Sequence, residues 1–156
     1  MPVNQRPTLG PMVSVTCLQQ LRIYTEDLAG PGPVLGAGRL RGRSVITDLG
    51  LEGSRLDDEK LLRVLVDTFG IDGTRLCLVV GVTSDASGTY EVQLVEGACT
   101  HGMQTTEPMC VYTLGVFTGA LQAVTGVVMQ GKETSCEAKG DPTCTYVIGP
   151  HRALGS

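Results

Sequence analysis

The sequence predicts an α+β fold in which an antiparallel sheet of about four strands packs against several helices. Apolar residues recur at helical spacing in the first 70 residues, whereas β-branched residues dominate several segments after residue 74. Turn residues join those later segments in pairs, and one helical segment lies between the two pairs. The expected order is therefore helices, hairpin, helix, hairpin, which is typical of an α+β domain.

Three helices are expected in the first part of the chain. Residues 12–29 carry apolar residues at positions 13, 17, 18, 21, 24 and 28, and "GPGP" ends that helix. A second helix over residues 34–50 is weakened by its glycines. Asp57 or Asp58 is expected to cap a third helix, which Gly70 or Gly73 ends. Its apolar stripe is Leu61, Leu62, Leu65, Val66 and Phe69.

The remaining elements are two hairpins and a helix. Residues 74–85 and 89–97 alternate in polarity and are joined by "DASG", which predicts the first hairpin. Residues 97–109 are expected to form a loop, and residues 110–126 a helix that begins just after Pro108. Residues 127–138 and 144–149 predict the second hairpin, with its turn at "KGDPT". We divide the chain into an arm and helix (1–29), one domain (30–149) and a tail (150–156).

Composition excludes several classes of protein. Hydrophobic residues make up 42% of the 156 residues and charged residues 18%, which is typical of a globular chain. The net charge is −4, and the one basic cluster (Arg39, Arg41 and Arg43) is expected to be a solvated helix face, so we expect no nucleic-acid partner. No apolar run reaches the roughly 20 residues of a transmembrane segment, and the first residues lack the pattern of a signal peptide. We therefore expect a cytoplasmic protein.

The six cysteines are the most informative residues for function. In a reducing compartment they are expected to be metal ligands or buried thiols, and Cys17 and Cys77 lie on apolar stripes that predict core positions. Cys136 and Cys144 flank a turn and can face each other across the hairpin. Glu133 precedes Cys136 by three residues, so the two side chains can share a face only if a bulge or the strand end lies between them.

Residue spacing alone leaves several interpretations of this hairpin open. Thiolates and a carboxylate suit zinc, and a fourth ligand can come from Cys110, Cys99, His101 or His151. Alternatively, the two thiols are apolar packing residues and Glu133 lies on the surface. A redox-active pair is disfavoured, because the spacing is not Cys-x-x-Cys and no cation is expected to be held against either thiol.

The segments "EPMCVYTLGVFTGALQAVTG" and "ETSCEAKGDPTCTYVI" resemble the C-terminal signature of the 4-vinyl reductase domain family. The resemblance covers residues 30–149 and is strongest over 96–148. The same fold occurs in sensor domains of phenol-responsive activators and in TRAPP subunits. The phenol sensors hold zinc through a Cys, a Glu and two further Cys, and the matching positions here are Cys110, Glu133, Cys136 and Cys144. The resemblance implies a structural zinc, because these ligands fill a tetrahedral ion and leave no position for water.

The resemblance also implies a cavity for a small hydrophobic molecule between the helices and the sheet. Phe69, Met109, Leu114 and Phe117 are the residues expected to line it. The aromatic groups that hold phenol in the sensors do not map onto this chain, which has no Trp and two Phe. An aliphatic or lipid-like ligand is therefore a better match than a phenol.

Two alternative functions follow from the same family. One is reduction of a vinyl group on a tetrapyrrole, or assistance to that reaction. The sequence shows no dinucleotide fingerprint and no catalytic constellation, so we expect a binding protein and assign no catalytic residue. The other is an assembly subunit, since TRAPP subunits are assembly proteins and the sensor domains dimerise. The helix over residues 12–29 can pack on a second copy or on its own sheet, and we expect a homodimer or a partner protein.

Overall fold

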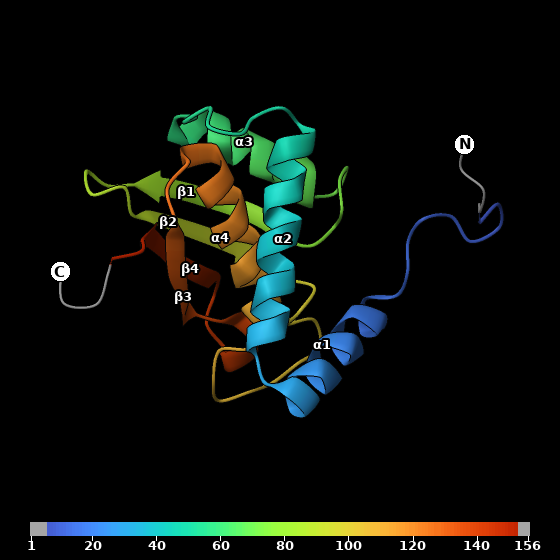
Figure 1. Cartoon of the computed structure of the whole chain (residues 1–156). Coiled ribbons are helices and arrows are strands. Elements are labelled where there is room, and N and C mark those ends of the chain that lie inside the picture. The colour runs from blue at the N-terminus through green and yellow to red at the C-terminus, as the bar shows by residue number, and fades with distance from the viewer. Residues whose placement is uncertain (1–5, 153–156) are drawn as a thin grey trace.

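The computed structural model describes residues 6–152 and contains four α-helices and a four-stranded antiparallel sheet (Figure 1). The helices are α1 (Val15–Ala29), α2 (Gly32–Asp48), α3 (Asp58–Phe69) and α4 (Val111–Thr125). The strands are β1 (Leu78–Ser84), β2 (Tyr90–Val95), β3 (Met129–Ser135) and β4 (Cys144–Pro150), and a 3-10 turn spans Glu137–Lys139. The predicted α+β class and the predicted order of elements are confirmed.

Local signals set several of these boundaries. The Asp57 carboxylate caps α3 by accepting a hydrogen bond from the Lys60 N–H at 2.9 Å. Gly70 ends α3, and its N–H donates to the Val66 carbonyl. Gly126 ends α4 in the left-handed conformation, which a glycine adopts without strain.

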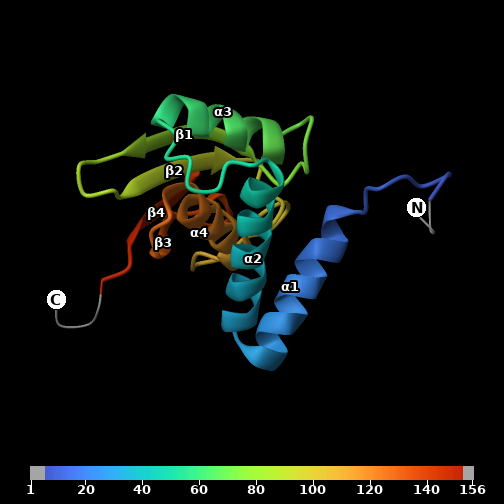
Figure 2. The same ribbon diagram turned by 45° about the horizontal axis from the view of Figure 1, so that its top comes forward.

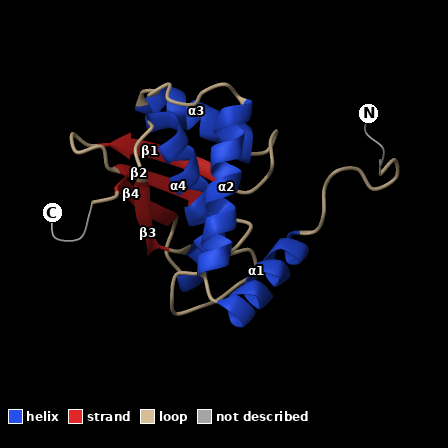
Figure 3. Cartoon of the chain, viewed as in Figure 1, coloured by secondary structure: helices blue, strands red, loops and turns tan. Residues whose placement is uncertain are grey.

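The strand order β1-β2-β4-β3 makes one sheet from the two predicted hairpins (Figure 3). Strands β2 and β4 join the hairpins by antiparallel pairing, with Val92 opposite Tyr146. The inner face of these two central strands is fully buried. Helix α3 packs against β1 and helix α4 against β3, so the core lies between the helices and this one face of the sheet.

Helices α2 and α4 touch backbone to backbone. Gly38 and Gly42 of α2 face Gly115 and Gly119 of α4, and a Cβ atom at any of the four would overlap a carbonyl oxygen of the other helix. The glycines that weaken the helix propensity of α2 are therefore required for this close approach. The contact places α4 between α2 and the sheet (Figure 1).

Helix α1 presents its apolar residues to solvent and buries polar ones. It lies beside α2, apart from the sheet (Figure 2). Gln19 and Arg22 are buried, and the Gln19 amide donates to the carbonyls of Ala98 at 3.0 Å and His101 at 2.7 Å. The side chains of Leu21, Tyr24 and Leu28 are 69%, 59% and 89% exposed. The expectation that this apolar stripe packs on its own sheet is therefore wrong.

Two further expectations need correction. Cys17 is exposed, because it lies on the face of α1 that is turned to solvent, whereas Cys77 is buried as predicted. Arg41 and Arg43 are solvated as expected, but Arg39 is half-buried and donates to the Met129 carbonyl at 3.0 Å. The absence of Cβ atoms at the glycine contact brings α2 close to α4, and Arg39 reaches across to the start of β3.

Replacing Gly42 with alanine should destabilise the protein. The new Cβ would meet the Val116 carbonyl, which is fixed in α4, so the helices must separate at a cost of about 2 kcal/mol or more. Gly36→Ala is the matched control in the same helix, because its Cβ meets nothing within 4 Å, and it should stabilise by about 0.5–1 kcal/mol. Urea denaturation measures both changes; equal effects of the two substitutions would contradict the backbone contact.

Candidate metal centre and apolar cavity

Four side chains from three parts of the chain converge at the N-terminus of α4. Cys110 is the N-cap residue of α4, Glu133 lies in β3, Cys136 follows the end of β3, and Cys144 begins β4. Their ligand atoms all lie within 4.8 Å of one another. The three cysteines are buried and Glu133 is half-buried, so the cluster lies at the edge of the core.

A β-bulge lets Glu133 and Cys136 face the same site. Glu133 pairs with Tyr146 and Ser135 pairs with Thr145, so the ladder shifts by one residue between them. Thr134 is the additional residue on the bulged strand. Because of this shift, side chains three apart in sequence point to the same face, as the sequence required for a shared site.

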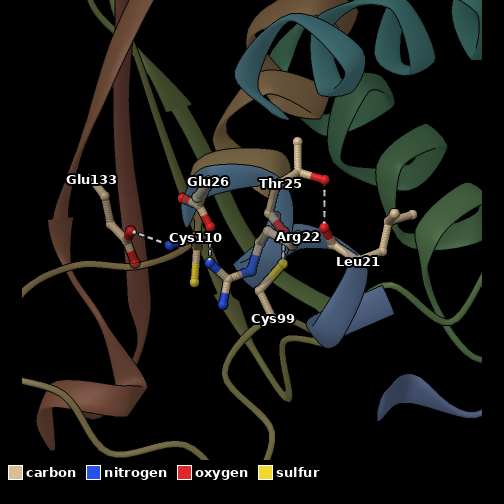
Figure 4. Close-up of polar contacts among 8 residues, drawn as sticks. Leu21, Arg22, Thr25, Glu26, Cys99, Cys110 and Glu133 are labelled. Carbon is tan, nitrogen blue, oxygen red and sulfur yellow. Dashed lines mark hydrogen bonds and ion pairs between the residues drawn. The ribbon is translucent and has the colours of Figure 1, made fainter. Parts of the chain in front are cut away.

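Two buried oxygen atoms at the cluster lack a hydrogen-bond partner among the described residues. Glu133 accepts the backbone N–H of Cys110 with Oε2 at 3.1 Å (Figure 4), while its Oε1 has no donor. The hydroxyl of Tyr146 is also unpaired, and it lies on the same face of the sheet. An unpaired buried carboxylate oxygen is costly unless a cation occupies the space beside it.

Burial and mutual contact perturb the acidity of the cluster. The hydrogen bond from the Cys110 thiol to Cys144, followed by burial, raises the pKa of Cys110 well above its usual range. The same hydrogen bond lowers the pKa of Cys144. Burial raises the pKa of Glu133 and of Cys136. A dication that binds here displaces the protons these groups would otherwise hold.

The surroundings of the cluster favour thiolates and order the turn that carries them. The backbone N–H of Glu137 donates to Cys144 Sγ at 3.3 Å, and the N–H of Cys136 donates to Asp141 at 2.9 Å. The cluster also lies at the N-terminus of the 15-residue helix α4, where the helix dipole stabilises negative charge. Three sulfurs and one carboxylate oxygen at these separations fit a zinc ion.

The other candidate ligands lie outside this cluster of four. Cys99 is buried and lies 3.5 Å from the Thr113 hydroxyl, and His151 is hydrogen-bonded to Gln130 on the surface. The backbone N–H of exposed His101 donates to the Gly97 carbonyl in the loop before α4. Cys110 alone of the proposed fourth ligands joins the hairpin residues.

A separate cavity of about 440 Å³ lies between the start of α1, helix α2, the end of α3 and the first turns of α4. Phe69 is the one residue of the predicted set that lines it. Phe117 lies in the core, where its ring packs edge-on against Phe69 with centroids 5.6 Å apart. Met109 and Leu114 are half-buried against the core, and none of the four cluster residues lines the cavity.

Sequence reasoning missed several residues at the cavity and near the cluster. Arg41, Arg75 and Tyr112 line the cavity, and no periodic pattern marked them. Arg22 is buried near Cys99 and pairs with Glu26 (Figure 4). A buried arginine on a helix with an apolar stripe of its own gives no sequence signal, because the stripe indicates the opposite orientation.

Comparisons with known proteins were made over the whole chain. Residues 93–150 match the family model of the 4-vinyl reductase domain. No curated protein sequence matches the chain. Within residues 6–152, none of the helices has the length and apolar character needed to cross a membrane.

Solved structures with the same fold include sensors and assembly subunits. The phenol-responsive sensory domain of the transcription activator PoxR, solved with phenol, is 20% identical, with a TM-score of 0.70 over 90% of this chain and 76% of that one. A vinyl-4-reductase family protein from Methanocaldococcus jannaschii is 13% identical, with a TM-score of 0.61 over 92% and 85%. A trafficking protein particle complex subunit 3 from Naegleria fowleri, covalently bound to palmitic acid, is 15% identical, with a TM-score of 0.51 over 90% and 92%. The resemblance drawn from the cysteine motifs is thus confirmed: residues 93–150 carry a 4-vinyl reductase domain, within a fold shared with these three structures.

Proposed function

We propose that this protein is a small-molecule-binding domain, a sensor or carrier, that takes an apolar ligand and is held together by a structural zinc ion. The cavity between α1, α2 and α4 carries the proposal, because its volume of about 440 Å³ falls in the range of ligand sites and its lining is mainly apolar. The relatives of the same fold are described with phenol and with palmitic acid, which are both largely apolar molecules.

The zinc ion would be held by Cys110, Glu133, Cys136 and Cys144. Four protein ligands leave no position for water, so the ion would serve structure and not catalysis. Its role would be to tie the β3–β4 hairpin to the start of α4, and to supply the partner that Glu133 Oε1 lacks.

Removing ligands should reduce zinc binding in a graded way. The purified protein should contain about one zinc per chain, measured by mass spectrometry. Glu133→Gln should weaken zinc binding at least about tenfold and leave the fold intact, because one charged ligand is lost and three thiolates remain. Cys136→Ser should lose stoichiometric zinc and lower the melting temperature, because it removes a thiolate from the buried set.

Cys17→Ser is the matched control for that experiment. Cys17 is an exposed thiol outside the cluster, so its loss should change neither zinc content nor stability. Unchanged zinc content in Cys136→Ser would reject the assignment. So would six freely titratable thiols in the untreated protein.

Filling the cavity should abolish ligand binding. Leu18 is half-buried on α1 and lines the cavity, so Leu18→Trp should lower the affinity for the neutral fluorophore N-phenyl-1-naphthylamine at least about tenfold. Leu21→Trp places the same residue on the exposed face of α1 and should leave binding unchanged. Equal affinities of the two variants in a fluorescence titration would show that the dye binds elsewhere.

We also propose that the protein forms a homodimer through α1. The side chains of Leu21, Tyr24 and Leu28 share a face and are exposed, which is unusual for residues of this size on one helix. The six free cysteines agree with the proposed cytoplasmic setting, where thiols stay reduced.

Polar substitutions on this face should separate the dimer. The triple variant Leu21→Glu, Tyr24→Glu, Leu28→Glu should elute as a monomer in light-scattering chromatography, whereas the wild type should have twice that mass. The matched control, Thr16→Glu with Ala29→Glu, adds charge at exposed positions of α1 away from this face and should stay dimeric. A monomeric wild type at micromolar concentration would contradict the proposal.

A further inference from the structure

The rim of the cavity carries unpaired positive charge. Arg41 and Arg75 line it, and no aspartate or glutamate does. Among residues 6–152, neither arginine has a carboxylate within 4.0 Å, although Arg43, two residues after Arg41, is paired with Glu52 at 3.5 Å. The chain as a whole carries a net charge of −4, so this concentration of positive charge is local to the cavity.

The backbone fixes Arg75 at the rim. It adopts a φ of 58°, in the left-handed region that a residue with a Cβ rarely occupies. Its N–H donates to the Gly70 carbonyl at 3.1 Å, and its Nε donates to the Ile71 carbonyl at 3.0 Å. These bonds hold the first part of the guanidinium in place and leave the Nη groups without a carboxylate partner. Strained residues of this kind often occur at binding sites.

Polar groups that suit a head group accompany the two arginines. The Tyr112 side chain lines the cavity close to Arg41: burial raises the pKa of Tyr112, and the positive charge of Arg41 opposes that rise. The Thr74 side chain also lines it, next to Arg75. Further inside, Phe69, Leu76 and Val116 are buried and purely apolar. The cavity therefore joins an apolar interior to a cationic, hydrogen-bonding rim.

We infer that the ligand is an amphiphilic organic anion, whose apolar body lies in the cavity between α1 and α4 and whose carboxylate binds Arg41 and Arg75. This inference rests on the proposed small-molecule function and names the chemical class of its ligand. Arginine matches a carboxylate in geometry and charge, and an anion would satisfy two cations that have no acidic partner among the described residues. Pro11, Met12 and Val13, just before α1, cover the apolar part of the cavity.

Isothermal titration of the full chain with three ligands of equal chain length tests this inference. The ligands are decanoate, the neutral 1-decanol and the cationic decylammonium, each kept below its micellar concentration. Decanoate should bind about tenfold more tightly than decanol, and decylammonium most weakly. Because the rim charges are exposed, the preference for decanoate should shrink as the salt concentration rises.

Variants locate the preference at the rim. The double substitution Arg41→Gln, Arg75→Gln should reduce the affinity for decanoate to that for decanol and leave decanol unchanged. Arg43→Gln is the matched control, since it removes an arginine from the same helix without touching this cavity, and it should retain the preference. Both arginines are exposed, so circular dichroism should show intact folding.

The outcomes separate the two proposals. Equal binding of decanoate and decanol by the wild type, or a preference that survives the double substitution, would overturn the anion assignment and leave the apolar site standing. Failure of all three ligands and of the neutral fluorophore to bind would overturn the small-molecule function itself.

Discussion

The structure depends on the contact between α2 and α4, where four glycines let two helix backbones meet. This contact fixes α4 against the sheet, and α4 then serves two sites at once. Its N-cap residue, Cys110, belongs to the cysteine cluster, and its first turns supply Tyr112 and Val116 to the cavity. A shift of α4 would therefore disturb both the cluster and the cavity, although the two share no residue.

The elements of the fold could be predicted from the sequence because their signals are local. Periodicity identified the four helices, and turn residues identified both hairpins. The orientation of α1 could not be predicted in this way. Periodicity shows which residues share a face but not the direction in which that face points, and the Gln19 amide finds two loop carbonyls that no local pattern reveals. Cys17 was misplaced for the same reason.

The candidate metal centre was predicted more completely than the cavity. Cys136 and Cys144 lie on one hairpin, so their proximity follows from local pairing, and the family resemblance supplied Cys110 and Glu133. The cavity is bounded by segments that are distant in sequence, and its rim residues Arg41 and Arg75 come from a helix and a turn without a shared motif. Composition predicted an apolar interior, but tertiary packing decides which apolar residues leave a space. Phe117 fills the core for that reason, while Phe69 also borders the cavity.

The place of β4 in the sheet has a consequence for biosynthesis. Strand β4 is the last strand in the chain, yet it lies between β2 and β3 and provides the link between the two hairpins. During translation, the β1–β2 hairpin and β3 therefore have no common partner until residues 144–150 leave the ribosome. The inner face of the sheet stays exposed up to that point, so a nascent chain of this protein is a natural client for a ribosome-associated chaperone.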